Sequence, residues 1–155
     1  MALQKKVGTA AALGVPGDKA VPDQSTYTPK NFLAGGNGTA AGSFCWASAD
    51  GTAAENSTSG SDAPLGFVER NQVYPAYDAV SEGTLVIPAG CPLMVAVRGD
   101  YFAAAQENCT RGGKVYADKT SGKVLAAAGS NGILADGWFF ETSGKAGDTV
   151  IISRQ

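Results

Sequence analysis

Apolar residues in this chain come in short runs that proline and glycine interrupt. The stretch TLVIPAGCPLMVAV (84–97) shows the pattern, with two runs rich in β-branched residues on either side of PAGCP. β-Branched residues favour strands, and a connection with two prolines and a glycine forms a tight corner. Similar runs recur at a spacing of about ten residues, and no long stretch has a 3.6-residue period. The sequence therefore predicts an all-β fold, a single β-sandwich or barrel.

Alternating residues locate further strands. In GSFCWASAD (42–50), Phe44 and Trp46 are expected on one side of a strand and Cys45 and Ala47 on the other. The remaining candidates are residues 65–80, residues 100–109 (a strand or a short helix), residues 112–128 (two strands joined by a KTSG turn), residues 132–142 and residues 148–154.

The N-terminal quarter of the chain has a different character. Residues 8–42 are irregular and are punctuated by Pro16, Pro22 and Pro29. Proline fixes φ and pushes the preceding residue toward extended geometry, so this segment is predicted to be extended, with turns. We therefore expect two parts, an extended N-terminal arm over residues 1–41 and a β-sandwich core over residues 42–155.

Composition excludes several classes of partner. The net charge is −2, and the one tight basic pair, Lys5–Lys6, does not make the basic stripe that nucleic-acid binding requires. No run of about 20 apolar residues is present, which predicts no membrane span, and the start lacks the pattern of a secretory signal. Only 17% of residues are charged and 21 are glycine, so we expect a neutral surface suited to close packing against other proteins.

Catalytic motifs are absent from the sequence. Without histidine the chain lacks His-based triads, Cys-His dyads and most zinc or iron sites. Cys45, Cys91 and Cys109 form no CxxC pair and are predicted to be packing residues, Cys91 at the corner between two strands. A hydrolase built on two carboxylates is disfavoured because most carboxylates lie in predicted turns. The chain is therefore expected to be no enzyme and to hold neither cofactor nor metal.

Aromatic residues leave a second interpretation open. Trp46, Tyr101, Trp138 or Phe139 can serve either as core residues or as a platform on which a sugar ring stacks. Trp138 and Phe139 are adjacent and must face opposite sides of a strand. If Trp138 or Tyr101 is exposed, the chain suits a β-sandwich carbohydrate-binding module, which is the alternative function.

The order of several motifs resembles a known family. The opening QKKVGTAAALGVPGDKAVPDQSTYTPKNFLAGGNGTAAGSFCWASAD is similar to the start of the structural cement, or head decoration, proteins of tailed bacteriophages. Further segments that resemble this family are APLGFVERNQ, VIPAGCPLMVAVRGDYFA, GGKVYADKTSGKV and GDTVIIS. The resemblance extends over nearly the whole chain.

The resemblance implies a jelly-roll β-sandwich on the outer surface of the virion's capsid, synthesised in the host cytoplasm. The protein would sit as a homodimer or homotrimer across junctions between major capsid protein subunits and stabilise the shell, without catalysis or a cofactor. In this hypothesis the extended N-terminal arm is the segment that attaches the protein to the capsid. Lys5 and Lys6 pair with acidic capsid groups, while four apolar residues bury against the shell, namely Val7, Val15, Tyr27 and Phe32.

Overall fold

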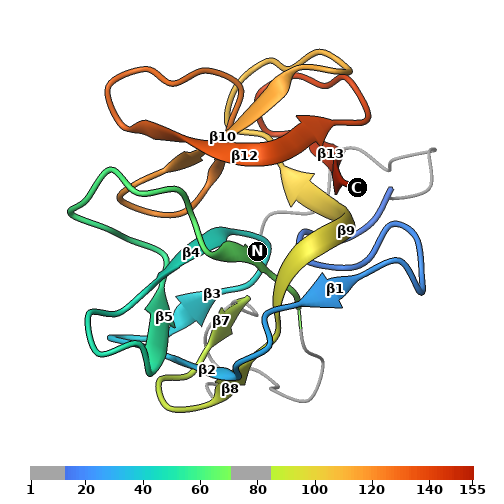
Figure 1. Ribbon diagram of the computed structural model, residues 1–155. Helices are drawn as coiled ribbons and strands as arrows, with labels where there is room; N and C mark the ends of the chain where they lie inside the picture. The colour runs from blue at the N-terminus through green and yellow to red at the C-terminus, as the bar shows by residue number, and fades with distance from the viewer. Residues whose placement is uncertain (1–12, 71–84) are drawn as a thin grey trace, which may run out of the picture.

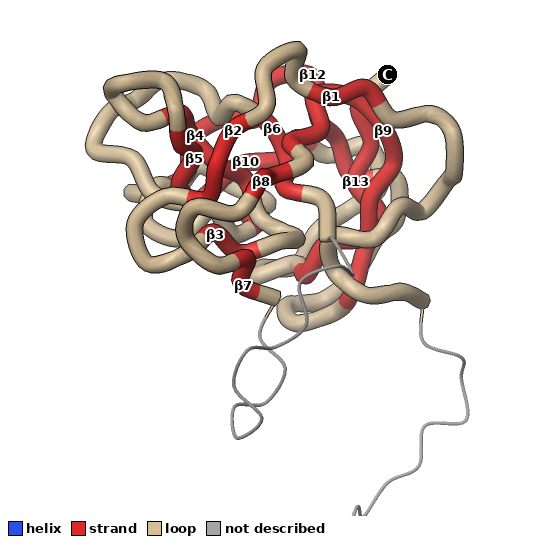
Figure 2. The backbone as a smooth tube through the Cα atoms, turned by 90° about the horizontal axis from the view of Figure 1, so that it is seen from below, coloured by secondary structure: helices blue, strands red, loops and turns tan. Residues whose placement is uncertain are grey.

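The computed structural model describes residues 13–70 and 85–155, and within these ranges it contains strands and no helix. Figures 1 and 2 show short strands joined by long loops. The all-β prediction is thus confirmed, while the jelly-roll connectivity stays a prediction. In chain order the strands are β1 (Thr26–Tyr27), β2 (Phe32–Ala34), β3 (Thr39–Ala40), β4 (Phe44–Ala47), β5 (Ala53–Glu55), β6 (Gly66–Val68), β7 (Val86–Ile87), β8 (Pro92–Leu93), β9 (Val95–Ala104), β10 (Lys114–Asp118), β11 (Val124–Leu125), β12 (Gly132–Phe140) and β13 (Thr149–Arg154).

Strand β9 joins two groups of strands. The main sheet has the order β11-β10-β12-β13-β9-β6-β4-β5-β2-β8, with β1 also paired to β9, while β3 and β7 form a separate small sheet. Figure 1 shows β10, β12 and β13 at one end of the molecule and β2, β5, β7 and β8 at the other. β9 is continuous through Gly99, whose φ of 131° lies outside the ordinary strand region and marks a distortion at this point.

The strands from β9 to β13 nearly close on themselves. Ala105, directly after β9, bridges Val124 of β11, and the Gln106 N–H donates to the Val124 carbonyl at 3.0 Å. A curled sheet of this kind encloses the side chains of its inner face. Those inner residues include Ala103, Val115 and Ile152, each fully buried.

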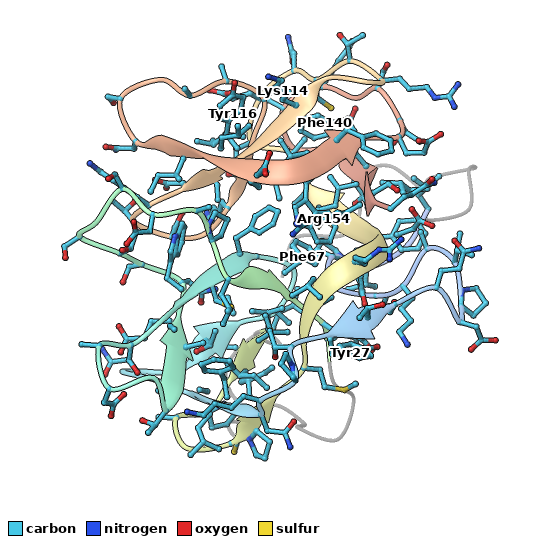
Figure 3. All side chains as sticks on the ribbon, in the orientation of Figure 1. Tyr27, Phe67, Lys114, Tyr116, Phe140 and Arg154 are labelled. Atoms are coloured by element: carbon cyan, nitrogen blue, oxygen red, sulfur yellow. The ribbon has the colours of Figure 1, made fainter. Side chains whose placement is uncertain are left out.

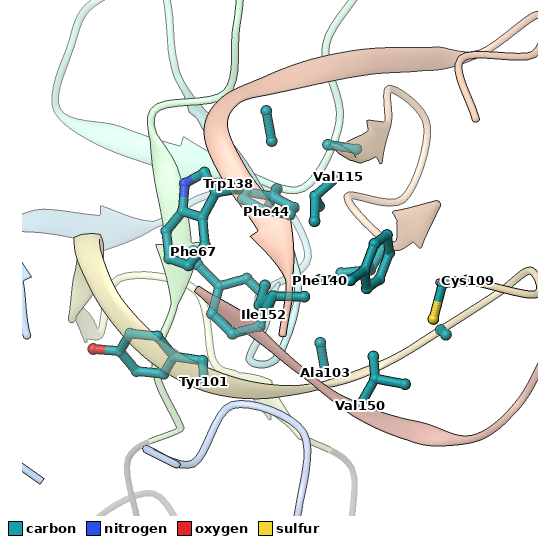
Figure 4. Packing of buried hydrophobic residues seen from close by; sticks show 14 of the residues in the cluster. Phe44, Phe67, Tyr101, Ala103, Cys109, Val115, Trp138, Phe140, Val150 and Ile152 are labelled. Carbon is teal, nitrogen blue, oxygen red and sulfur yellow. The ribbon is translucent and has the colours of Figure 1, made fainter. Parts of the chain in front are cut away.

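The larger core is aromatic. Phe44 and Phe67 come from the other group of strands and meet Trp138 of β12 inside the curled sheet (Figure 4). The Phe44 ring lies edge-on to Phe67 and to Trp138, with ring centroids 5.3 and 5.6 Å apart. Offset and edge-to-face contacts of this kind add to the apolar burial of the rings. This cluster therefore fastens the two groups of strands to each other.

A second, mainly aliphatic core lies on the other side of β4 and β6. Phe44 and Phe67 face the aromatic core, while Cys45 and Val68, the next residues along each strand, face the second core. The period of two places neighbours on opposite faces, so β4 and β6 are buried on both sides. The predicted alternation of Phe44 and Cys45 is confirmed. The second core consists of Phe32, Ala34, Ala41, Cys45, Ala54, Val68, Ile87, Leu93 and Val95.

The corner within residues 84–97 matches its prediction. β7 ends at Ile87, a turn follows, and β8 begins at Pro92, with Gly90 at a φ of 81°. Cys91 is half-buried and packs against the second core, as expected of a packing residue. Residues 100–104 belong to β9, which settles the choice between strand and helix for the start of that segment.

The described part of residues 1–41 pairs with the rest of the fold, and the division into an arm and a core stays a prediction. Residues 13–41 contribute β1, β2 and β3, which pair with β9, β5, β8 and β7. Phe32 is 7% exposed and belongs to the second core, because the alternation of β2 turns Phe32 inward and Leu33 outward. Residues 1–12 lie outside the described residues, and for them the arm stays a prediction.

Candidate interaction surface

Residues 13–28 form a strap along β9. The Gly17 N–H donates to the Phe102 carbonyl at 2.8 Å, the Phe102 N–H to Asp18 O at 3.0 Å, and the Ala20 N–H to Asp100 O at 2.8 Å. After a loop over residues 21–25, β1 resumes the pairing, with Thr26 opposite Arg98. The strap therefore covers the edge of β9 that β13 does not occupy. This pairing satisfies backbone groups that an edge strand would otherwise leave open.

Glu69 anchors the strap through side chains. Its Oε2 accepts hydrogen bonds from the Tyr27 hydroxyl at 2.6 Å and from the Tyr101 hydroxyl at 3.0 Å. Its Oε1 lies 3.8 Å from Lys19 Nζ, which sits 5.5 Å from the centre of the Tyr27 ring. Next to it, Arg70 Nη1 contacts Asp18 Oδ1 at 3.2 Å. A charged acceptor strengthens such hydrogen bonds, so this cluster fixes the strap on the end of β6.

The electrostatics of the cluster suit an anchor. The pKa of Lys19 is raised, first by its hydrogen bond with Tyr27 and further by Glu69, although burial opposes the change. Burial raises the pKa of Tyr101 above its usual range. At neutral pH Lys19 is charged and Tyr101 is neutral. Lys19 therefore attracts the carboxylate of Glu69, and the Tyr101 hydroxyl can donate a hydrogen bond to it. Figure 4 shows the Tyr101 ring within the aromatic core and its hydroxyl directed away from it.

Apolar side chains are exposed on the outer side of the strap. Leu13, Val15 and Val21 are 56%, 39% and 38% exposed. Gly14, between two of them, faces the Phe102 ring so closely that a Cβ there would collide with it. The strap therefore lies flat on β9 while its apolar residues point to solvent. Exposed apolar residues gathered on one segment are typical of contact surfaces.

The structure distributes the predicted contact residues unevenly. Val15 lies on the exposed side of the strap, as a contact residue should. Tyr27 is half-buried against Glu69, and Phe32 is a core residue of its own chain, with 7% of its surface exposed. Lys5, Lys6 and Val7 lie outside the described residues. Glu69 was missed, because its bond to Tyr27 joins residues 42 positions apart that share no local pattern.

The predicted exposed aromatics are buried. Trp138 is 3% exposed and Tyr101 is 0% exposed, so neither offers a ring face to a sugar. Adjacent residues face opposite sides of a strand, and in β12 it is Trp138 that turns inward while Phe139 is half-buried. The carbohydrate-binding alternative loses the two residues on which it depended.

The buried thiols are unsuited to nucleophilic chemistry. Burial raises the pKa of Cys45 to about 12, and burial also raises the pKa of Cys109. Over residues 13–70 and 85–155, no three histidine, cysteine, aspartate or glutamate side chains group in a way that can hold a metal ion. Within the same ranges, no helix is long and apolar enough to cross a membrane.

Comparisons with known proteins agree with the fold. A chain in the solved structure "The capsid of Myoviridae Phage XM1" aligns with a TM-score of 0.68 at 18% identity, over 99% of this chain and 97% of that one. At this identity the likeness shows a shared fold. A search of the curated proteins finds no match. The family model of the XM1 gp53 minor capsid protein matches residues 4–154, which confirms the predicted relation to structural proteins of phage heads. The chain belongs to the XM1 gp53 minor capsid protein family.

Proposed function

We propose that the protein is a non-enzymatic cement, or decoration, protein of a phage head. In this proposal it binds the outer surface of the capsid across junctions between major capsid protein subunits and stabilises the shell. Membership of a minor capsid protein family supports a structural role in the capsid. The observation that carries the cement role is the strap, a rigid segment that presents apolar side chains to solvent.

The strap can act as a preformed contact. Its backbone is already paired with β9, so binding a shell costs little ordering entropy. Leu13, Val15 and Val21 are partly exposed, and burying such side chains yields roughly 25 cal/mol per Å² of apolar surface. Lys5, Lys6 and Val7 precede the strap in sequence and extend the proposed contact toward acidic capsid groups.

Assembly strengthens a modest single contact. A homodimer or homotrimer that touches two or three capsid subunits gains effective concentration, roughly 10²–10⁴-fold in avidity. A protein that binds only the assembled shell stabilises that shell by mass action. The proposed cement role needs no catalytic residue.

The direct test is co-sedimentation with phage heads that lack this protein. Purified protein is titrated against immature and against expanded heads, and bound copies are counted per capsid subunit. Saturation at a fixed ratio is expected, and that ratio identifies the local symmetry axis. Absence of binding to both forms of the head contradicts the proposal.

Strap residues are tested with a matched control. Replacing Leu13, Val15 and Val21 with serine should weaken head binding by at least tenfold, because the proposed apolar contact is lost. The control replaces Leu33, Val86 and Met94, which are similarly exposed but lie on other segments. Equal loss in both triple variants contradicts the assignment of the contact to the strap.

Truncation should remove only residues 1–12, because a deletion to residue 32 removes the core residue Phe32.

A further inference from the structure

A polar pocket borders the strap where β9 is distorted. Its volume is about 420 Å³, and it lies where the loop of the strap, β9 and the end of β13 meet. The lining residues are Gln24, Arg98, Gly99, Asp100, Arg154 and Gln155. Two guanidinium groups and two amide side chains therefore surround one hollow.

Both arginines are positioned by strand pairing. Arg98 lies opposite Thr26 of β1, and Arg154 lies opposite Gly99 on the other edge of β9. The Arg154 side chain passes over Gly137 of β12, where a Cβ would lie 3.0 Å from Arg154 Nε. Gly137 has a φ of 79°, so glycine both permits the backbone and leaves room for the arginine. Figure 3 shows Arg154 where β9, β12 and β13 converge.

The charges in the pocket are unbalanced among its side chains. Of the chain's four arginines, Arg70 and Arg111 form ion pairs with Asp18 and Glu141. Within the described ranges, the other two, Arg98 and Arg154, form no ion pair and meet in this pocket. Asp100, 9% exposed, supplies one carboxylate against two guanidinium groups. In a chain whose net charge is −2, two arginines without an ion-pair partner among the described residues make this pocket a local concentration of positive charge.

We propose that the pocket binds an aspartate or glutamate side chain of the capsid protein, an inference that rests on the proposed function. A guanidinium presents a planar fork of N–H donors that matches the two oxygens of a carboxylate. Gln24 belongs to the same loop of the strap as the exposed Val21. The pocket and the apolar strap therefore form one continuous contact, in which the strap supplies buried area and the pocket supplies register.

The test uses Arg98→Gln and Arg154→Gln, singly and together, in the full chain. Co-sedimentation with heads that lack the protein is measured at low salt and at 0.3 M salt, a level at which exposed charges are strongly screened (roughly 6 Å Debye length). Each single variant should bind about tenfold more weakly at low salt, because a charge-assisted contact is lost. The double variant should also bind with little salt dependence. Arg111→Gln is the control, since it removes the same charge from an exposed ion pair elsewhere.

The outcomes separate the two proposals. If the wild-type protein binds heads and the double variant binds equally well, the pocket assignment is overturned and the cement role stands. If the wild-type protein does not bind, both are overturned. Thermal unfolding of each variant checks its fold. If Arg154→Gln is unstable, the binding of Arg98→Gln decides the result, because Arg98 is exposed. A glutamate-rich peptide should compete with heads for the wild-type protein, and competition by short DNA alone would overturn the choice of a carboxylate.

Discussion

A single side chain links β3 and β4, which share no backbone ladder. Asn56 Oδ1 accepts from the Ala40 N–H at 2.6 Å, and its Nδ2 donates to the carbonyls of Phe44 at 2.9 Å and Ala40 at 3.3 Å. The same Phe44 donates its N–H to the Gly122 carbonyl at 2.7 Å, in the turn between β10 and β11. Asn56 therefore secures a junction that has no regular ladder.

Replacing Asn56 with alanine should lower the free energy of unfolding by about 1–3 kcal/mol, because it leaves part-buried backbone groups without partners. Urea denaturation measures the change. Asn37→Ala is the control, because Asn37 is exposed and lies in a turn. A loss at Asn56 no larger than the loss at Asn37 would show that water replaces the amide without cost.

The Glu69 cluster predicts a limit of stability at alkaline pH. The pKa of Tyr101 is raised by burial, and the pKa of Lys19 is raised by its hydrogen bond with Tyr27 and by Glu69. A group whose pKa is raised in the folded state gives its full stabilisation below the unfolded pKa, near 10 for both types, and loses it as pH rises further. Stability should therefore fall above pH of about 10, by up to roughly 1.4 kcal/mol per pH unit for Tyr101. Denaturation of Tyr101→Phe should show a shallower fall, whereas Tyr116→Phe, with an outward-facing ring, should follow the wild type.

At the scale of elements, the strap is held to β9 by separate backbone hydrogen bonds and to the end of β6 by Glu69. Removing that carboxylate by Glu69→Ala leaves the hydroxyls of Tyr27 and Tyr101 without their acceptor. Hydrogen exchange should then accelerate at the amides of Gly17 and Ala20 by at least tenfold, with little change in β10 and β12. The matched variant Glu141→Ala breaks an exposed ion pair and should leave the strap protected. Uniform acceleration across the whole chain would mean that the strap does not open on its own.

Sequence reasoning located the elements that carry a local pattern. The strands β10 to β13 alternate and are bounded by turns, so their positions were predictable. β1, β2 and β3 have two or three residues each, too few to show a period, and β1 pairs with residues about 70 positions away. Prolines there indicated an extended chain correctly, but an extended chain can pair with its own sheet as well as with a neighbour. Arg98 and Gly99 interrupt the apolar run of β9, which hid its continuity.

Which face of a strand is buried is a tertiary property. The adjacent pair Trp138 and Phe139 predicted opposite faces and left open which of them lies inside. The answer comes from Phe44 and Phe67, which pack on Trp138 from the other group of strands. The two pocket arginines, Arg98 and Arg154, also lie far apart in the sequence, so no local motif predicts that they line one pocket. In contrast, the motifs that resemble phage head proteins follow one another over nearly the whole chain, and the family match over residues 4–154 confirms the relation that they indicated.

At the scale of the whole molecule, the residues that make the body rigid are different from those that form the proposed contact surface. Two cores share β4 and β6, so the body cannot shear without disturbing both, while the arginine pocket borders the strap and takes its lining from the strap loop, β9 and the end of β13. If it binds several capsid subunits, as proposed, such a rigid body transfers its binding free energy to the assembled shell. That free energy amounts to about 2.7 kcal/mol per site when the free protein is at 100 times its Kd.

Heads that lack the protein should therefore melt at a higher temperature as the protein is added, with the rise continuing beyond saturation of the sites. In the proposed cement role only the intact shell presents the junctions, so linkage makes the shift depend on the concentration of free protein. Calorimetry of expanded heads measures it, with the serine variant of Leu13, Val15 and Val21 as the control of equal size and charge. That variant should need at least ten times more protein for the same shift. If binding saturates but the melting temperature of the heads does not change, the protein decorates the head without stabilising it, and the proposed cement role is contradicted.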